Sequence, residues 1–179
     1  MRITTFFICA LAVAVLATGL TSALGAGETS ALSGTWRIDH ARGTELSPWK
    51  DYKLTITLDG DGISFHRRLS WGIREFTDSM TIHAGRTDTV PVEMWPDNRH
   101  LGAYISASHD KRVHAEWLDA RRILRLSTDL VLETQQGSRA VNILSAYKVS
   151  ASGNQLTLTE LRSTRNKPIV YVFTRVASK

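Results

Sequence analysis

Apolar and polar residues alternate with a period of two along most of the chain beyond residue 50. Residues 52–58 read Tyr-Lys-Leu-Thr-Ile-Thr-Leu, so that every second side chain is apolar. This alternation is typical of a β-strand with one buried face. The run ends at Asp59-Gly60-Asp61-Gly62, where glycine allows the positive φ of a tight turn. Residues 63–71 then resume the alternation, and the two runs together predict a β-hairpin.

Further segments repeat this pattern and are separated by turn-forming residues. The additional predicted strands are Phe76–His83, Leu101–Ala107, Val113–Trp117, Ile123–Leu132, Ala140–Val149, Gln155–Leu161 and Ile169–Val176. A helix competes only over Ala115–Leu126, where the context favours strand–turn–strand. The pattern predicts an all-β fold of about eight to ten strands, arranged as an antiparallel up-and-down β-barrel, which buries its edges by closing on itself. A flat sandwich is the alternative.

The N-terminal segment has the order of features of a secretory signal peptide. Arg2 supplies a positive start, residues 6–20 are almost entirely apolar, and residues 22–26 offer small side chains to a signal peptidase. We expect a signal peptide over residues 1–26, cleaved near Gly25 or Ala26, followed by a barrel domain over residues 33–177. The expected location is the bacterial periplasm or the exterior. The single cysteine, Cys9, lies inside the leader, so the exported chain has no disulfide and no cysteine-ligated zinc.

The chain is basic, with a formal net charge of +5 and a sequence pI near 9.7. Its cations are spread along the sequence, mostly beside turns, where solvated charges are expected; they are Arg67-Arg68, Lys111-Arg112, Arg121-Arg122, Arg162, Arg165 and Lys167. This spread favours a role in solubility over a dedicated polyanion site, and no nucleic-acid partner is predicted. A peripheral contact with an anionic membrane surface remains an alternative.

Short motifs at both ends of the predicted domain resemble one family. Ser33-Gly34-Thr35-Trp36 opens the domain, and Tyr171–Val176, which contains Arg175, closes it. The segments Trp117–Arg121 and Ser150–Leu158 add a mid-chain turn and a late hairpin. Together they resemble the lipocalin/calycin superfamily, and most closely its small exported bacterial lipocalin-like members.

The resemblance implies a structural role for Gly34, Trp36 and Arg175. In that family the tryptophan packs beneath the barrel against the arginine of the last strand. Arg175 would then lie over the Trp36 ring as a cation–π pair and bond nearby carbonyls. We expect this signature to maintain the fold and to contact no ligand.

Tests for chemistry identify no catalytic, metal or cofactor motif. The best metal arrangement joins His109, His114 and Glu116 across a hairpin, but structural surface histidines are the preferred interpretation. A haem could bind to one inward histidine, His66, His83 or His100, but none of them lies in a recognisable haem motif. No nucleophile elbow is present.

The barrel interior is the remaining candidate site. Phe65, Leu69 and Trp71 share a strand face, to which other strands add Ile105 and Trp117. Arg67 lies on the same apolar face, where burial requires an anionic partner from the protein or from a ligand, unless a bulge turns it outward.

We therefore predict that the interior binds a small apolar or amphipathic molecule without catalysis, with an acidic head on Arg67 and the apolar body on the other five residues. The alternative is a filled barrel whose basic rim contacts an envelope protein or an anionic surface. An isomerase-like or hydrolase-like enzyme is the third class.

Overall fold

The computed structural model describes residues 31–44, 49–92, 104–105 and 108–177. Its strands are β1 (Gly34–Ile38), β2 (Asp51–Asp59), β3 (Gly62–Trp71), β4 (Arg74–His83), β5 (Thr87–Pro91), β6 (Tyr104–Ile105), β7 (Asp110–Leu118), β8 (Ile123–Thr134), β9 (Gly137–Val149), β10 (Gln155–Arg162) and β11 (Ile169–Arg175). The predicted signal peptide and most of the predicted strand Leu101–Ala107 lie outside these residues. No helix in the described parts of the chain is long and apolar enough to cross a membrane.

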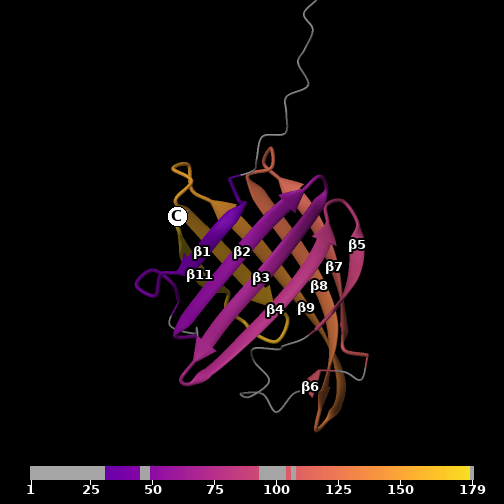
Figure 1. Ribbon diagram of the computed structural model, residues 1–179. Helices are drawn as coiled ribbons and strands as arrows, with labels where there is room; N and C mark the ends of the chain where they lie inside the picture. Colours follow the sequence, from indigo (N-terminus) through magenta and orange to yellow (C-terminus); the bar gives the residue numbers. More distant parts are fainter. Residues whose placement is uncertain (1–30, 45–48, 93–103, 106–107, 178–179) are drawn as a thin grey trace, which may run out of the picture.

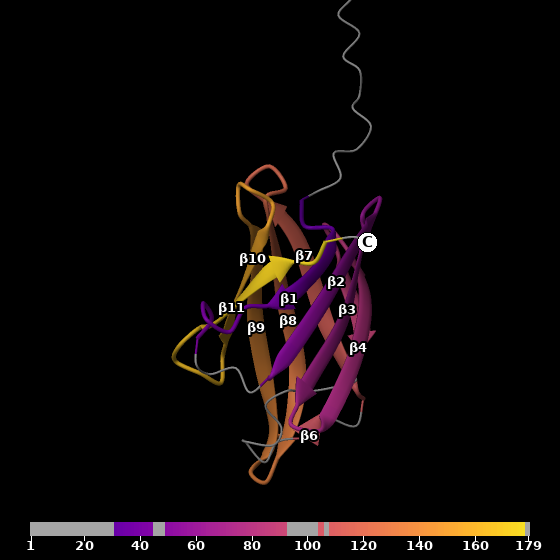
Figure 2. The same cartoon turned by 60° about the vertical axis from the view of Figure 1, so that its left-hand side comes forward.

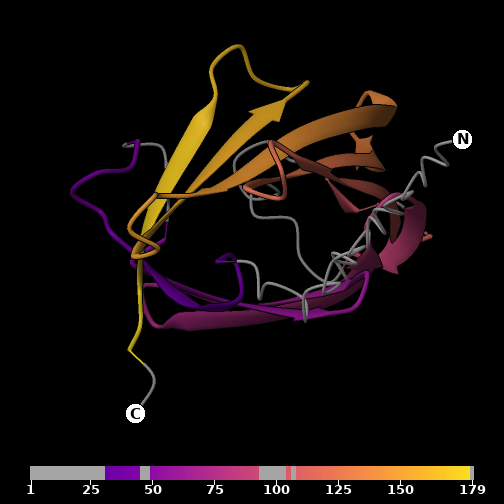
Figure 3. The same ribbon diagram turned by 90° about the horizontal axis from the view of Figure 1, so that it is seen from above.

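The strands form one continuous antiparallel sheet in the order β4-β3-β2-β1-β11-β10-β9-β8-β7-β5, with β6 paired to β8. Seen from above, the sheet curls so that the indigo-to-magenta strands face the orange-to-yellow ones (Figure 3). The prediction of an all-β antiparallel barrel is confirmed, and the flat sandwich is not formed. β1 pairs with β11, which joins the N-terminal strands of the sheet to the C-terminal ones, and the two strands lie side by side in Figure 2.

The predicted hairpin over residues 52–71 is present, and its register explains which side chains face inward. β2 and β3 pair from Asp51↔Ser70 to Asp59↔Gly62, with Gly60 at φ 61° in the turn. Residues 115–126 form strand–turn–strand, as favoured over the helix. β5 was not predicted from the sequence, because Thr-Asp-Thr-Val-Pro shows no clear alternation of apolar side chains.

The two ends of the barrel differ, and we name each by a tryptophan. The Trp36 end carries the β2–β3, β4–β5 and β7–β8 turns, whereas the Trp71 end carries the β3–β4, β8–β9 and β10–β11 turns (Figure 1). Aromatic rings pack against one another inside: Tyr52 lies 5.0 Å from Phe173, and Phe65 on β3 lies 5.3 Å from Tyr147 on the opposite wall, between ring centroids. This part of the interior is therefore packed core. A separate small apolar cluster of Leu130, Leu132, Val141 and Ile143 lies on the β8–β9 hairpin.

The barrel is nearly closed, with its seam between β4 and β5. These two strands are the ends of the hydrogen-bonded order, and at the Trp36 end the turn between them contacts β7. Gly85 donates its N–H to the carbonyl of Ala115 at 2.7 Å, and Ala84 forms an isolated bridge with Ala115. The β4–β5 turn is thus tied to β7 at this end of the seam.

Candidate functional site

Arg67 lies on the inner face of β3, between the buried side chains of Phe65 and Leu69. It stands directly opposite Asp78 of β4 in the register, and its Nη2 forms an ion pair with Asp78 Oδ2. Asp78 is only 2% exposed. Arg67 therefore faces inward and is not turned outward by a bulge, and its anionic partner is a carboxylate of the protein itself. This ion pair offsets part of the cost of burying the Arg67 charge.

A second ion pair lies on the inner face of β10. Leu156, Leu158, Glu160 and Arg162 follow one another on this face, so the two charges continue an apolar row into the barrel. Arg162 Nη2 donates to Glu160 Oε2 at 2.6 Å, and Arg162 is 4% exposed. The expectation that Arg162 is a solvated charge beside a turn is wrong. The alternation along β10 could have revealed that Arg162 faces inward, because the strand continues through Arg162 and the turn begins only at Ser163.

The hydroxyls of Tyr52 and Tyr147 lie near the charges of Arg67 and Glu160. Tyr52 shares a hydrogen bond with the Arg67 guanidinium, and burial raises its pKa above the ordinary value although Arg67 opposes this shift. Burial also raises the pKa of Tyr147 well above its ordinary value. Both phenols are therefore neutral hydrogen-bonding groups at neutral pH. The site predicted from the sequence contains neither tyrosine, nor Asp78, Glu160 or Arg162.

These groups border a cavity of about 70 Å³ inside the barrel. It is lined by Arg67, Met80, Val92, Lys111, Leu126, Thr128, Leu130, Ile143, Ser145, Tyr147, Glu160 and Arg162. Sites that enclose a drug-sized ligand usually measure roughly 300–1,000 Å³. The cavity therefore has room for a few waters or for a polar head group.

Five side chains around this cavity form what we call the charged layer: Arg67, Asp78, Lys111, Glu160 and Arg162. They bring three positive and two negative charges together inside the barrel. In a low-dielectric interior, such an excess of positive charge favours an anionic group.

The predicted ligand-contacting residues do not lie together. Phe65 and Leu69 belong to the packed core, whereas Trp71 is 37% exposed at the end of β3. Trp117 is half-buried at the Trp36 end, where the Arg121 guanidinium lies 5.2 Å from its ring centroid. Ile105 is in β6, and the structure does not describe its side chain. Of the five predicted residues whose side chains the structure describes, Arg67 alone lines the cavity described above.

The signature residues meet at the Trp36 end. The Arg175 guanidinium lies 4.1 Å from the Trp36 ring centroid and donates hydrogen bonds to the carbonyls of Gly153, Ser33 and Ala31. Gly34 has φ 141°, and a Cβ there would collide with Arg175. Glycine is thus needed for the close approach of the guanidinium.

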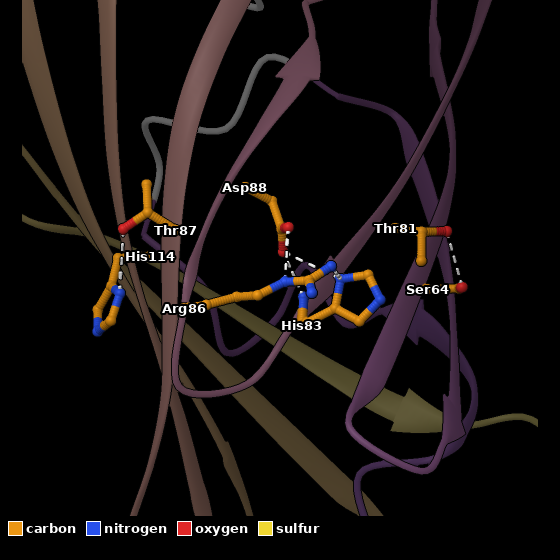
Figure 4. Close-up of polar contacts among 7 residues, drawn as sticks. All are labelled: Ser64, Thr81, His83, Arg86, Thr87, Asp88 and His114. Atoms are coloured by element: carbon orange, nitrogen blue, oxygen red, sulfur yellow. Dashed lines mark hydrogen bonds and ion pairs between the residues drawn. The ribbon is translucent and has the colours of Figure 1, made fainter.

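Four of the described histidines, His40, His66, His83 and His114, have protein partners for their rings. His83 Nδ1 receives a hydrogen bond from Arg86 at 2.6 Å, while Asp88 accepts the backbone N–H of His83 at 2.6 Å (Figure 4). His114 contacts the Thr87 hydroxyl at 3.3 Å (Figure 4). Within the described ranges, no group of three or more metal-ligating side chains occurs.

A larger hollow, of about 570 Å³, lies along β5, β7, β8 and β9. Its lining includes Thr89, Arg112, Asp129 and Asn142, which neighbour one another across the strands. All four are exposed or half-exposed side chains of the outer wall. The charged layer has the stronger claim to a ligand, because its charges are enclosed.

Comparison of the sequence with protein-family models and with curated proteins finds no match. Solved structures do match in fold. A fatty acid binding protein of Schistosoma mansoni in complex with arachidonic acid aligns with a TM-score of 0.52 and 10% identity, over 84% of this chain and 100% of that one. Two secretory abundant heat soluble proteins of Ramazzottius varieornatus align with TM-scores of 0.50 and 0.51, each at 11% identity, over 83% and 82% of this chain and 96% of theirs. The chain therefore shares the barrel fold of these proteins, and at these identities the likeness concerns the fold alone.

Proposed function

We propose that the protein binds a small amphipathic molecule in the barrel interior, without catalysis, and that the acidic head of this molecule enters the charged layer. The observation that carries the proposal is the enclosed set of three cations and two carboxylates beside the 70 Å³ cavity. Arg67 and Arg162 would orient the head, with Lys111 adding positive charge. The matched fatty acid binding protein, whose structure holds arachidonic acid, has the same kind of barrel.

The apolar body of the ligand would extend from the cavity along Leu130 and Ile143 toward the Trp71 end. These two residues line the cavity and also belong to the apolar cluster on the β8–β9 hairpin. Phe65 and Tyr147 would form the floor on the other side. We further propose that the protein is exported to the periplasm or the exterior, as the N-terminal sequence indicates.

The first test is native mass spectrometry of the protein isolated from its own host. We expect a reproducible bound mass of a small molecule, which denaturing extraction then releases for identification. The protein mass itself shows whether residues 1–26 have been removed.

The variant for this test replaces the buried pair as a whole. Arg67→Ala alone would leave Asp78 buried and unpaired, which costs about 3–5 kcal/mol, whereas exchanging a buried ion pair for apolar residues is often neutral. We therefore expect R67M/D78L to fold and to lose the bound mass. The matched control is R68Q/E75Q, which removes an exposed ion pair from the outer face of the same two strands and should retain the ligand. Ligand retained by R67M/D78L would contradict the head-group role.

The second candidate is a filled barrel that acts through its exterior. The contact of Phe65 with Tyr147 favours it, because it shows that opposite walls meet over part of the interior. A ligand-free mass in the experiment above would support this candidate over the first.

A further inference from the structure

The tip of the β3–β4 hairpin exposes apolar side chains at a position where turns are usually polar. Trp71 pairs with Arg74, so Gly72 and Ile73 form a two-residue turn with Gly72 at φ 61°. Glycine at the first turn position suits a type II′ hairpin, and Gly, Asn, Asp and Ser dominate such turns. Ile73 is fully exposed, and Trp71 beside it is 37% exposed. No contact within the fold explains an isoleucine here.

The outer wall that leads to this tip is positively charged. Arg37, Lys53 and Arg68 occupy neighbouring positions across β1, β2 and β3 on the outer face. Two acids lie beside these cations, and each is held by an arginine: Arg37 bonds Asp51 at 2.9 Å, and Arg68 pairs with Glu75. Lys53 is therefore the cation of this set that neither acid balances.

Two further cations flank the tip itself. Lys50 directly precedes β2, and its N–H bonds the carbonyl of Ser70, next to Trp71. Arg74 is the first residue of β4, directly after Ile73. Neither has an ion-pair partner among the described residues. An exposed aliphatic and an exposed aromatic side chain thus lie next to two cations in the sequence and register. The β3–β4 hairpin that carries them lies at one end of the barrel (Figure 1).

We propose that this hairpin tip docks the protein on an anionic lipid bilayer. Ile73 would enter the boundary between head groups and acyl chains, and Trp71 would lie at head-group level, where tryptophan is favoured. Lys50, Arg74 and the basic wall would face the lipid phosphates, since each cation near such a surface adds attraction. Apolar side chains framed by cations match the chemistry of an anionic membrane surface.

The docked orientation directs the Trp71 end of the barrel toward the bilayer. This is the end toward which the ligand would extend in the function proposed above, so docking there would shorten the path between membrane and interior. The docking itself does not depend on an interior ligand, and the two proposals can fail separately.

The test measures binding to lipid vesicles by co-sedimentation. The protein is produced from its full coding sequence in its own host and used in the form that the cell accumulates. Vesicles are made of phosphatidylcholine alone or of phosphatidylcholine mixed with phosphatidylglycerol. We expect binding to the anionic vesicles only, weakened by salt. I73S should bind about tenfold more weakly, and K50Q or R74Q roughly fivefold more weakly.

The matched control is Leu161→Ser, which removes an exposed leucine, 48% accessible, from the outer face of β10. It should bind like the unaltered protein, and the thermal midpoint of I73S should be unchanged because Ile73 touches little. Lipids brominated on their acyl chains should quench tryptophan fluorescence, and W71F should lose that quenching. Equal binding to both vesicle types, or equal binding by I73S and L161S, would overturn the proposal.

Discussion

Tyr52 and Tyr147 place their hydroxyls among the interior charges, and burial raises the pKa of each. In the unfolded chain a tyrosine titrates near pH 10. Above that pH the folded state holds more protons than the unfolded state, so the free energy of unfolding must fall as pH rises. We expect stability to decline above about pH 10 and the decline to be shallower in Tyr147→Phe. Urea unfolding across this pH range measures it, and identical slopes for both proteins would contradict the interpretation.

At the same scale, Arg67 shows how far single residues can be interpreted from sequence. Its place on an apolar strand face was visible, and so was its need for an anionic partner. The identity of that partner was not, because Asp78 becomes a neighbour only through the register of β3 against β4. A shift of one residue would turn Asp78 to the other face of the sheet.

At the scale of elements, the β4–β5 turn holds the seam of the barrel. Burial alone would raise the pKa of Asp88, but hydrogen bonds from His83 and the charge of Arg86 lower it overall. Its stabilising contribution is therefore present above the ordinary aspartate pKa of about 4 and is lost as pH falls through the lowered value.

We expect Asp88→Ala to lower the free energy of unfolding by about 1–3 kcal/mol at neutral pH, with a smaller difference in acid. Hydrogen exchange should accelerate at the Gly85 amide, which bonds Ala115 across the seam. Asp119→Ala is the control, since Asp119 lies in another turn of the same end and makes an exposed ion pair with Arg122. Unaltered exchange at Gly85 in Asp88→Ala would show that the carboxylate does not hold the seam.

For the whole molecule, the pairing of the first strand with the last connects the N-terminal half of the sheet to the C-terminal half. β1 and β11 share only three register pairs, and Arg175 ties this joint to three backbone carbonyls as well as to Trp36. We expect Arg175→Ala to cost about 2–3 kcal/mol. Arg175→Lys should recover little, because an ammonium group cannot reproduce the planar fork of donors. Thermal unfolding measures both variants, and full recovery by lysine would refute the role of the fork.

The sequence by itself determined the class of fold, because period-two alternation and glycine turns act locally and specify strands and hairpins. It also placed Arg67 among apolar residues. Only the tertiary structure decided that Asp78 pairs with Arg67, that Glu160 and Arg162 line the same cavity as Arg67, that Phe65 and Leu69 are packed core, and that Trp117 and Trp71 lie at opposite ends. These outcomes depend on strand register and on which walls meet when the sheet curls, and both are set by contacts between residues far apart in the chain.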